Sequence, residues 1–249
     1  MTHIYQCEIE LHDNLYYATR EIGRLYETEA ILHNYSLCYA LGFVDSEKHR
    51  TTVNDEYSYK YFCQEQIPKY KEHLTLLNEQ GIYITPAKSI SHSAVLNTWK
   101  YANNNYHVEM EKTQKNIPSF GRNKEIAPES KFECFIISKN SFKKENTVNV
   151  WQWKIPKFIR LGKWMSKAEV IINKLDYKIK KNSNFTCAYP LNPLDVMFTN
   201  QLISYDVINM PPVSLIKNVT MKGDHYQISL DENSKQLVNI PVNMNYRFE

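Results

Sequence analysis

The densest run of residues able to bind a ligand surrounds Gly162. Arg160, Lys163 and Lys167 flank this glycine, and Trp164 lies between the two lysines. A glycine between two strands lets a backbone approach a ligand closely, and the free amides of such a turn can hold a phosphate. We therefore predict that the three cations contact phosphates and that Trp164 stacks on a base. The alternative is a hairpin whose lysines only keep an edge soluble and whose tryptophan belongs to the core.

Positive charge is concentrated in one segment of the chain. Residues 139–181 carry 12 Lys and Arg against three acidic residues, a net charge of +9, whereas the whole chain has +3. Aromatic residues are interleaved in the segment, among them Trp151, Trp153, Phe158, Trp164 and Tyr177. Phosphates bind Lys and Arg, and bases stack on rings, so this composition favours single-stranded nucleic acid. A solvated lysine face above buried tryptophans would have the same composition.

Motifs for common enzyme chemistry are missing from the sequence. The six glycines are too scattered for a Walker loop or a dinucleotide fingerprint, and no GxSxG or CxxC spacing occurs. The eight histidines show no HExxH or HxH spacing. We therefore expect no catalytic residue, no metal and no cofactor. The open alternative is a metal-independent ribonuclease that uses His12 or His33 beside Lys163 as general acid or base.

The length and composition predict one globular domain over residues 1–249. The chain has a mass of 29.5 kDa, with 43% hydrophobic and 23% charged residues. We expect no signal peptide at its start, and no apolar run reaches the ~18 residues of a spanning helix. Five scattered cysteines without metal or disulfide spacing indicate free thiols in a reducing compartment. These features predict a cytoplasmic protein without membrane contact.

The hydrophobic patterns predict a mixed α+β fold with more strand than helix. Apolar residues alternate over 5–11, which indicates a first strand, and residues 31–41 and 68–79 have helical signals that end at Gly42 and Gly81. Further strands are predicted at 82–84, 95–99, 132–138, 151–161, 164–172 and 226–230, and another element near 198–203. The short connections favour an antiparallel sheet.

A connector from Leu15 to Glu29 is dense in tyrosine and arginine. Arg20 and Arg24 are four apart, so a helical connector would place them on one face. We predict that both contact phosphates and that Tyr17 stacks on a splayed base. The alternative is that the two arginines pair with Glu27 and Glu29.

Residues from about 100 to 131 are polar and predict a long inserted hairpin or loop. Long segments of this kind in compact domains are usually functional or disordered. We expect this excursion to lie across the nucleic acid or a neighbouring subunit, with Lys100, Arg122 and Lys124 near phosphates.

Several blocks of the sequence resemble the Csc-one family, the Cas-five-like subunits of type I-D CRISPR Cascade. The matching blocks are His12–Glu29, His33–Tyr35, Ile67–Tyr70, Gly81–Tyr83, Arg160–Glu169 and Pro190–Asp195. The resemblance extends in order over nearly the whole chain, and residues 103–131 contribute least to it.

The resemblance implies a RAMP fold, a modified RRM or ferredoxin-like antiparallel sheet with helices on one face. It implies a non-catalytic subunit that holds the 5′ handle of the CRISPR RNA at the foot of the complex. The implied partners are the CRISPR RNA, target DNA near the PAM, a large Cas-ten-like subunit and a backbone Cas-seven-like subunit. Guide pairing supplies sequence specificity in such effectors, so the protein reads backbone and shape. A CRISPR-RNA processing endoribonuclease and a protein-only assembly adaptor are the competing hypotheses.

Overall fold

The computed structural model describes residues 2–44, 68–101, 119–140, 155–230 and 237–248. Strands dominate these residues, and only three helices occur among them, at Asn34–Ala40 (α1), Tyr70–Gln80 (α2) and Pro193–Val196 (α3). The predicted strand-rich α+β class is therefore confirmed. No helix in the described part of the chain is long and apolar enough to cross a membrane.

The largest sheet has seven strands and contains the predicted first strand. Its order is β10-β11-β1-β9-β6-β4, and β5 also pairs with β9. The strands are β1 (His3–Leu11), β4 (Ile31–Leu32), β5 (Ile82–Ile84), β6 (Ala87–Ser91), β9 (Lys131–Ser138), β10 (Phe158–Leu161) and β11 (Ser166–Leu175). Every pairing in it is antiparallel. Alternating residues of β1 are buried, as the sequence pattern predicts.

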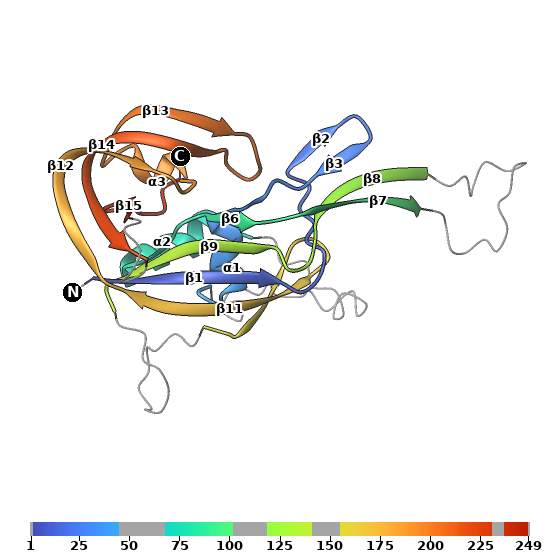
Figure 1. The fold of residues 1–249 in the computed structure, drawn as a ribbon, viewed down its shortest axis with the longest axis horizontal. Coiled ribbons are helices and arrows are strands. Elements are labelled where there is room, and N and C mark those ends of the chain that lie inside the picture. The colour runs from blue at the N-terminus through green and yellow to red at the C-terminus, as the bar shows by residue number, and fades with distance from the viewer. Residues whose placement is uncertain (1, 45–67, 102–118, 141–154, 231–236, 249) are drawn as a thin grey trace, which may run out of the picture.

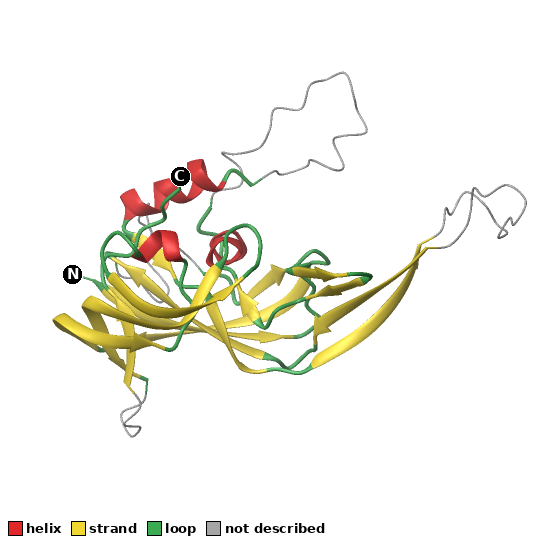
Figure 2. Ribbon diagram, turned by 90° about the horizontal axis from the view of Figure 1, so that it is seen from above, coloured by secondary structure: helices red, strands yellow, loops and turns green. Residues whose placement is uncertain are grey.

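A second sheet of four strands packs against the same core. It consists of β12 (Tyr177–Cys187), β13 (Gln201–Ile208), β14 (Leu215–Ser229) and β15 (Leu237–Pro241). One cluster of buried side chains joins both sheets, from Ile4 and Phe135 in the first to Tyr226 and Ile228 in the second. Figure 2 shows the helices on one side of the strands.

The third sheet projects from the body as an arm (Figure 1). It has the order β2-β3-β8-β7, and its strands are β2 (Arg20–Ile22), β3 (Leu25–Glu27), β7 (Ala94–Tyr101) and β8 (Ser119–Ile126). The predicted excursion is thus a hairpin of β7 and β8, and residues 102–118 at its tip lie outside the described residues.

The connector is a β-hairpin and not a helix. β2 and β3 turn at Gly23, which has a φ of +62°, and β3 pairs in parallel with β8. That pairing with a distant strand overrides the helical spacing of Arg20 and Arg24. The helix signals near Gly42 and Gly81 are confirmed, because both glycines adopt the left-handed conformation after α1 and α2.

Candidate nucleic-acid interface

The turn between β10 and β11 holds the glycine that the sequence singled out. Gly162 has a φ of +77°, and a Cβ there would lie 2.7 Å from the backbone oxygen of Tyr16. The Lys163 amide donates to that oxygen at 2.9 Å, and the Met165 amide donates to the Gly162 oxygen at 3.3 Å. The close approach is therefore to the chain's own connector. The prediction that free amides of this turn hold a phosphate is wrong for these two amides, since both are already hydrogen-bonded within the chain.

The side chains around this turn are available to a ligand. Arg160 is exposed, donates from Nη1 to the Met165 oxygen at 3.1 Å, and lies 3.9 Å from the Asp13 carboxylate. Lys163 is exposed, and the Lys167 Nζ lies 4.3 Å from the centre of the Phe158 ring. Within the described residues, no carboxylate lies within 4 Å of either lysine ammonium. Lys163 and Lys167 thus have no carboxylate partner among the residues that the structure describes.

Trp164 is an exposed platform and not a core residue. Its side chain is 54% exposed, and its ring centroid lies 4.5 Å from that of Tyr16, with a 34° angle between the planes. Tyr16 itself is buried, so it supports the indole from the protein side. Phe158 adds a second ring that is 44% exposed. Exposed rings flanked by cations are the arrangement that stacks bases and holds phosphates of a single strand.

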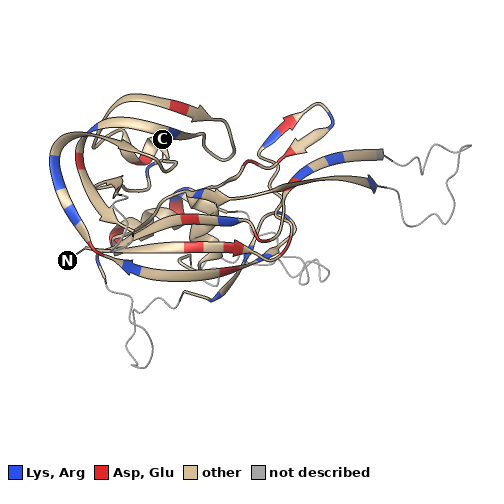
Figure 3. Cartoon of the chain, viewed as in Figure 1, with Lys and Arg blue, Asp and Glu red and all other residues tan. Residues whose placement is uncertain are grey.

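The arm brings together the cations predicted in the excursion. Lys100, Arg122 and Lys124 lie on one face of the hairpin, because the cross-strand pairs on that face are Leu96 with Lys124, Thr98 with Arg122, and Lys100 with Phe120. Phe120 is 60% exposed on the same face. Figure 3 shows basic residues along this arm and acidic residues on β1.

A groove of about 500 Å³ lies on one face of the arm sheet, and residues of both hairpins line it. Its walls are Ile22, Arg24, Leu25, Thr98, Phe120 and Arg122. The structure thus places Arg24 of the connector beside Arg122 of the excursion, two predictions made from separate parts of the sequence. A groove lined by apolar side chains, an exposed ring and two arginines suits a nucleotide.

Two other predicted cations are neutralised by carboxylates. The Arg20 guanidinium bonds to Glu27 at 2.5 Å and lies 3.2 Å from Glu29, and the Lys124 ammonium lies 3.3 Å from Glu27. The Arg20 hydrogen bond holds the pKa of Glu27 below its usual range. These ion pairs attach β3 to its neighbours. For Arg20 the alternative pairing with Glu27 and Glu29 therefore holds.

Arg24 differs from Arg20, because no carboxylate lies within 4 Å of its guanidinium among the described residues. The same holds for Arg122. Tyr17 is half-buried and packs against the core, and burial raises the pKa of its hydroxyl. This packing argues against the predicted stacking role of Tyr17. Exposed rings at this end include Trp164, Phe158, Phe120 and Trp99. Neither Phe120 nor Phe158 was among the site residues predicted from the sequence.

The two histidines weighed for catalysis have different surroundings. His33 is buried, its Nε2 lies 3.1 Å from the Val213 oxygen, and its Nδ1 accepts from the Tyr35 amide. Burial lowers the pKa of His33 to about 4, so it stays neutral with both ring nitrogens engaged. His12 is exposed, with Nε2 3.6 Å from Glu169. No group of three His, Cys, Asp or Glu able to hold a metal occurs in the described residues.

The connector joins the two clusters of candidate residues into one end of the molecule. Tyr16 supports Trp164 at its start, and Arg24 lines the groove at its end. Trp151 and Trp153, which the sequence predicts beside the cations, lie outside the described residues. A strand-rich α+β protein with this aromatic and cationic end has the features of a single-strand-binding protein.

The chain belongs to the family described as Type I-D CRISPR-associated protein Cas5/Csc1, whose model matches residues 2–249. No curated protein matches the sequence. Among solved structures, it is similar to a chain of "Cryo-EM structure of the Type III-B Cmr-beta bound to cognate target RNA and AMPPnP", with 9% identity and a TM-score of 0.38. That match covers 87% of this chain and 86% of the other. A TM-score this low does not establish a shared fold.

Proposed function

We propose that this chain is a non-catalytic RNA-binding subunit of a type I-D CRISPR effector complex, in which it holds the 5′ handle of the CRISPR RNA. The observation that carries the proposal is the exposed, cation-flanked Trp164 in a chain of this family. Stacking on Trp164 and phosphate contacts from Arg160, Lys163 and Lys167 hold an unpaired strand without reading its sequence. Arg24 and Arg122 extend the contact into the arm groove.

The remaining parts of the proposal follow from the family. The fold is a RAMP variant of the RRM sheet, with one copy at the foot of the complex in the cytoplasm. The neighbours are the large Cas-ten-like subunit and the backbone Cas-seven-like subunit, with target DNA near the PAM. The arm of β7 and β8, which extends from the body, is suited to reach across the RNA or an adjacent subunit.

A cleavage assay separates this proposal from a processing endoribonuclease. The full-length chain is incubated with a precursor repeat RNA in EDTA, and the products are resolved on a denaturing gel. We expect intact RNA that is bound but not cut. Defined cuts that vanish in His12→Ala, the variant of the exposed histidine, would establish the nuclease instead. Absence of RNA from the complex purified with its partner subunits would favour a protein-only adaptor.

A further inference from the structure

A second group of cations lies far from the candidate handle site. β11 leads into β12 with only Asp176 between them, and four lysines flank this bend, Lys174 before it and Lys178, Lys180 and Lys181 after it. We call them the lysine ridge. All four are exposed, and in the part of the chain that the structure describes no carboxylate lies within 4 Å of their ammonium groups. With Asp176 as the acidic residue within the run, the ridge carries a local charge of +3.

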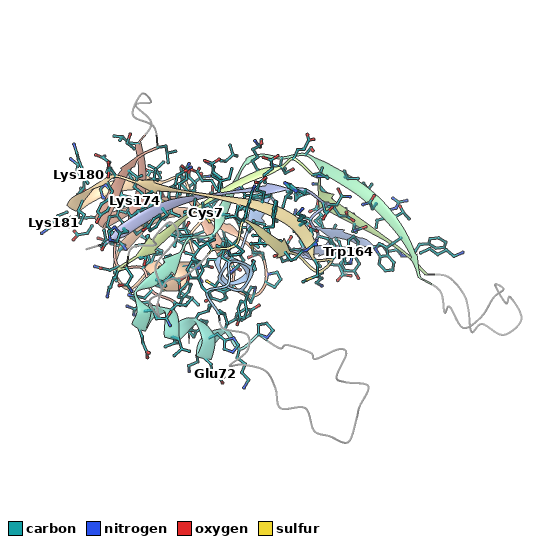
Figure 4. The ribbon with its side chains drawn as sticks, turned by 90° about the horizontal axis from the view of Figure 1, so that it is seen from below. Cys7, Glu72, Trp164, Lys174, Lys180 and Lys181 are labelled. Atoms are coloured by element: carbon teal, nitrogen blue, oxygen red, sulfur yellow. The ribbon has the colours of Figure 1, made fainter. Side chains whose placement is uncertain are left out.

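The ridge is separate from the cations around Gly162. Lys167 and Lys174 are on the same strand, seven residues apart, which is about 23 Å at 3.3 Å per residue. Figure 4 shows Trp164 toward one end of the molecule and Lys174, Lys180 and Lys181 at the other. A ligand bound at Trp164 therefore does not reach the ridge unless it is extended.

The ridge lacks the aromatic platforms of the handle site. Tyr177 is the aromatic residue within the run, but its ring packs edge-on against Tyr226 at 5.0 Å and its hydroxyl donates to the Thr2 oxygen. Single strands are held by stacking as well as charge, whereas a duplex hides its bases and presents phosphates. Cations without rings match the duplex.

The spacing of the lysines also suits a phosphate backbone. Lys178 and Lys180 are two residues apart on β12 and therefore point to the same face. From Lys174 to Lys180 the chain spans up to about 20 Å. At 3.4 Å of helix axis for each phosphate of one strand, that length covers about six base pairs.

Edge protection is the competing explanation, because lysines on outer strands prevent edge-to-edge pairing. In the second sheet β12 and β13 are both outer strands, on opposite sides of β14. β13 has no Lys or Arg and exposes Ile203, Tyr205 and Val207 instead. Lysine is therefore not the general means of edge protection in this sheet, so edge protection alone does not explain the lysines of β12.

We infer that the lysine ridge is a second nucleic-acid contact that holds the phosphates of a double helix without reading its sequence. This contact goes beyond the proposed handle-binding role, because it requires neither RNA nor an unpaired strand. Its strength depends on ionic strength and not on base sequence.

The test compares two double variants of the full-length chain that each remove two positive charges. Lys178→Gln/Lys180→Gln acts on the ridge, and Lys69→Gln/Lys71→Gln acts on the start of α2, where both lysines are exposed and Lys69 lies 3.5 Å from Glu72. Binding of a fluorescent 20-base-pair DNA of arbitrary sequence is followed by anisotropy between 50 and 200 mM salt. We expect the ridge variant to lower the salt slope by about 1.8 and the affinity roughly 60-fold at 0.1 M salt. The α2 variant and the charge-retaining Lys178→Arg/Lys180→Arg should bind like the unaltered chain.

Three results would overturn the inference. Equal losses in the ridge and α2 variants would mean that only bulk charge matters. Unchanged duplex binding with loss of a partner subunit on co-purification would assign the ridge to an acidic protein surface. Aggregation of Lys178→Gln/Lys180→Gln, with unchanged duplex binding by Lys174→Gln/Lys181→Gln, would assign it to edge protection. Handle RNA serves as a separate probe, because it should bind all of these variants normally and fail only if the proposed function is wrong.

Discussion

Replacing Trp164 with alanine separates stacking from charge at the proposed handle site. The indole is 54% exposed and rests on Tyr16 with one side. A base stacked on such a ring contributes about 1–3 kcal/mol, which corresponds to a loss of roughly 5- to 150-fold in affinity at 1.4 kcal/mol per factor of ten. Stacking involves no counterion release, so the salt dependence of binding should stay the same.

The same substitution has a limited cost in stability. A fully buried aromatic side chain replaced by alanine costs about 3–5 kcal/mol. Since Trp164 is about half exposed, we expect no more than about half of that, roughly 2 kcal/mol, and a folded variant. Urea unfolding measures this cost alongside RNA binding.

Fluorescence anisotropy with a single-stranded handle RNA provides the main readout. Trp164→Phe keeps a ring and should recover most of the affinity. Phe198→Ala is the matched control, since Phe198 is 63% exposed and follows α3, outside the proposed site. If Trp164→Ala folds and binds RNA as tightly as the Phe198→Ala control, the stacking platform does not exist.

Three further predictions address the backbone, a buried acid and the arm groove. Gly162→Ala forces a side chain into the left-handed region against a backbone oxygen, so the free energy of unfolding should fall by at least about 1–2 kcal/mol. An unchanged midpoint of urea unfolding would contradict this. Burial raises the pKa of Asp195 to about 7, so the folded state keeps a proton that the unfolded state loses above pH 4. The free energy of unfolding should therefore fall from pH 4 to pH 7, by at most about 1.4 kcal/mol per pH unit. Asp195→Asn should remove this part of the pH dependence, and an identical pH profile for the variant would refute the prediction. Arg24→Gln and Arg122→Gln should each lower the salt slope of handle binding by about 0.7. Arg20→Gln should lower it less, because Arg20 is already paired with Glu27. Equal changes in slope for the three variants would show that the groove does not contact the RNA.

Local signals in the sequence were sufficient for the elements that depend on local chemistry. The alternation of apolar residues predicts β1, and the position of Gly81 predicts the end of α2, because both signals depend on neighbouring residues. The connector was different, because β3 pairs with β8 far along the chain and that pairing outweighs the spacing of Arg20 and Arg24. The single-domain organisation over 1–249 remains a prediction.

The candidate site was predictable in its charges but not in its geometry. Composition located the cations around Gly162, yet it could not tell whether Trp164 was core or surface. That depends on Tyr16, which comes from the distant connector and covers only one side of the indole. Likewise, ion pairing of Arg20 but not Arg24 follows from the β2–β3 register, which places Arg20 opposite Glu27.

The most direct test of the RNA-binding claim is ultraviolet cross-linking of the assembled complex, followed by identification of the cross-linked peptides by mass spectrometry. Cross-links from the 5′ handle should fall on the exposed rings of Trp164, Phe158 and Phe120. Handle cross-links confined to β1, which carries Glu8 and Glu10, or to other subunits with none on this chain, would contradict the account.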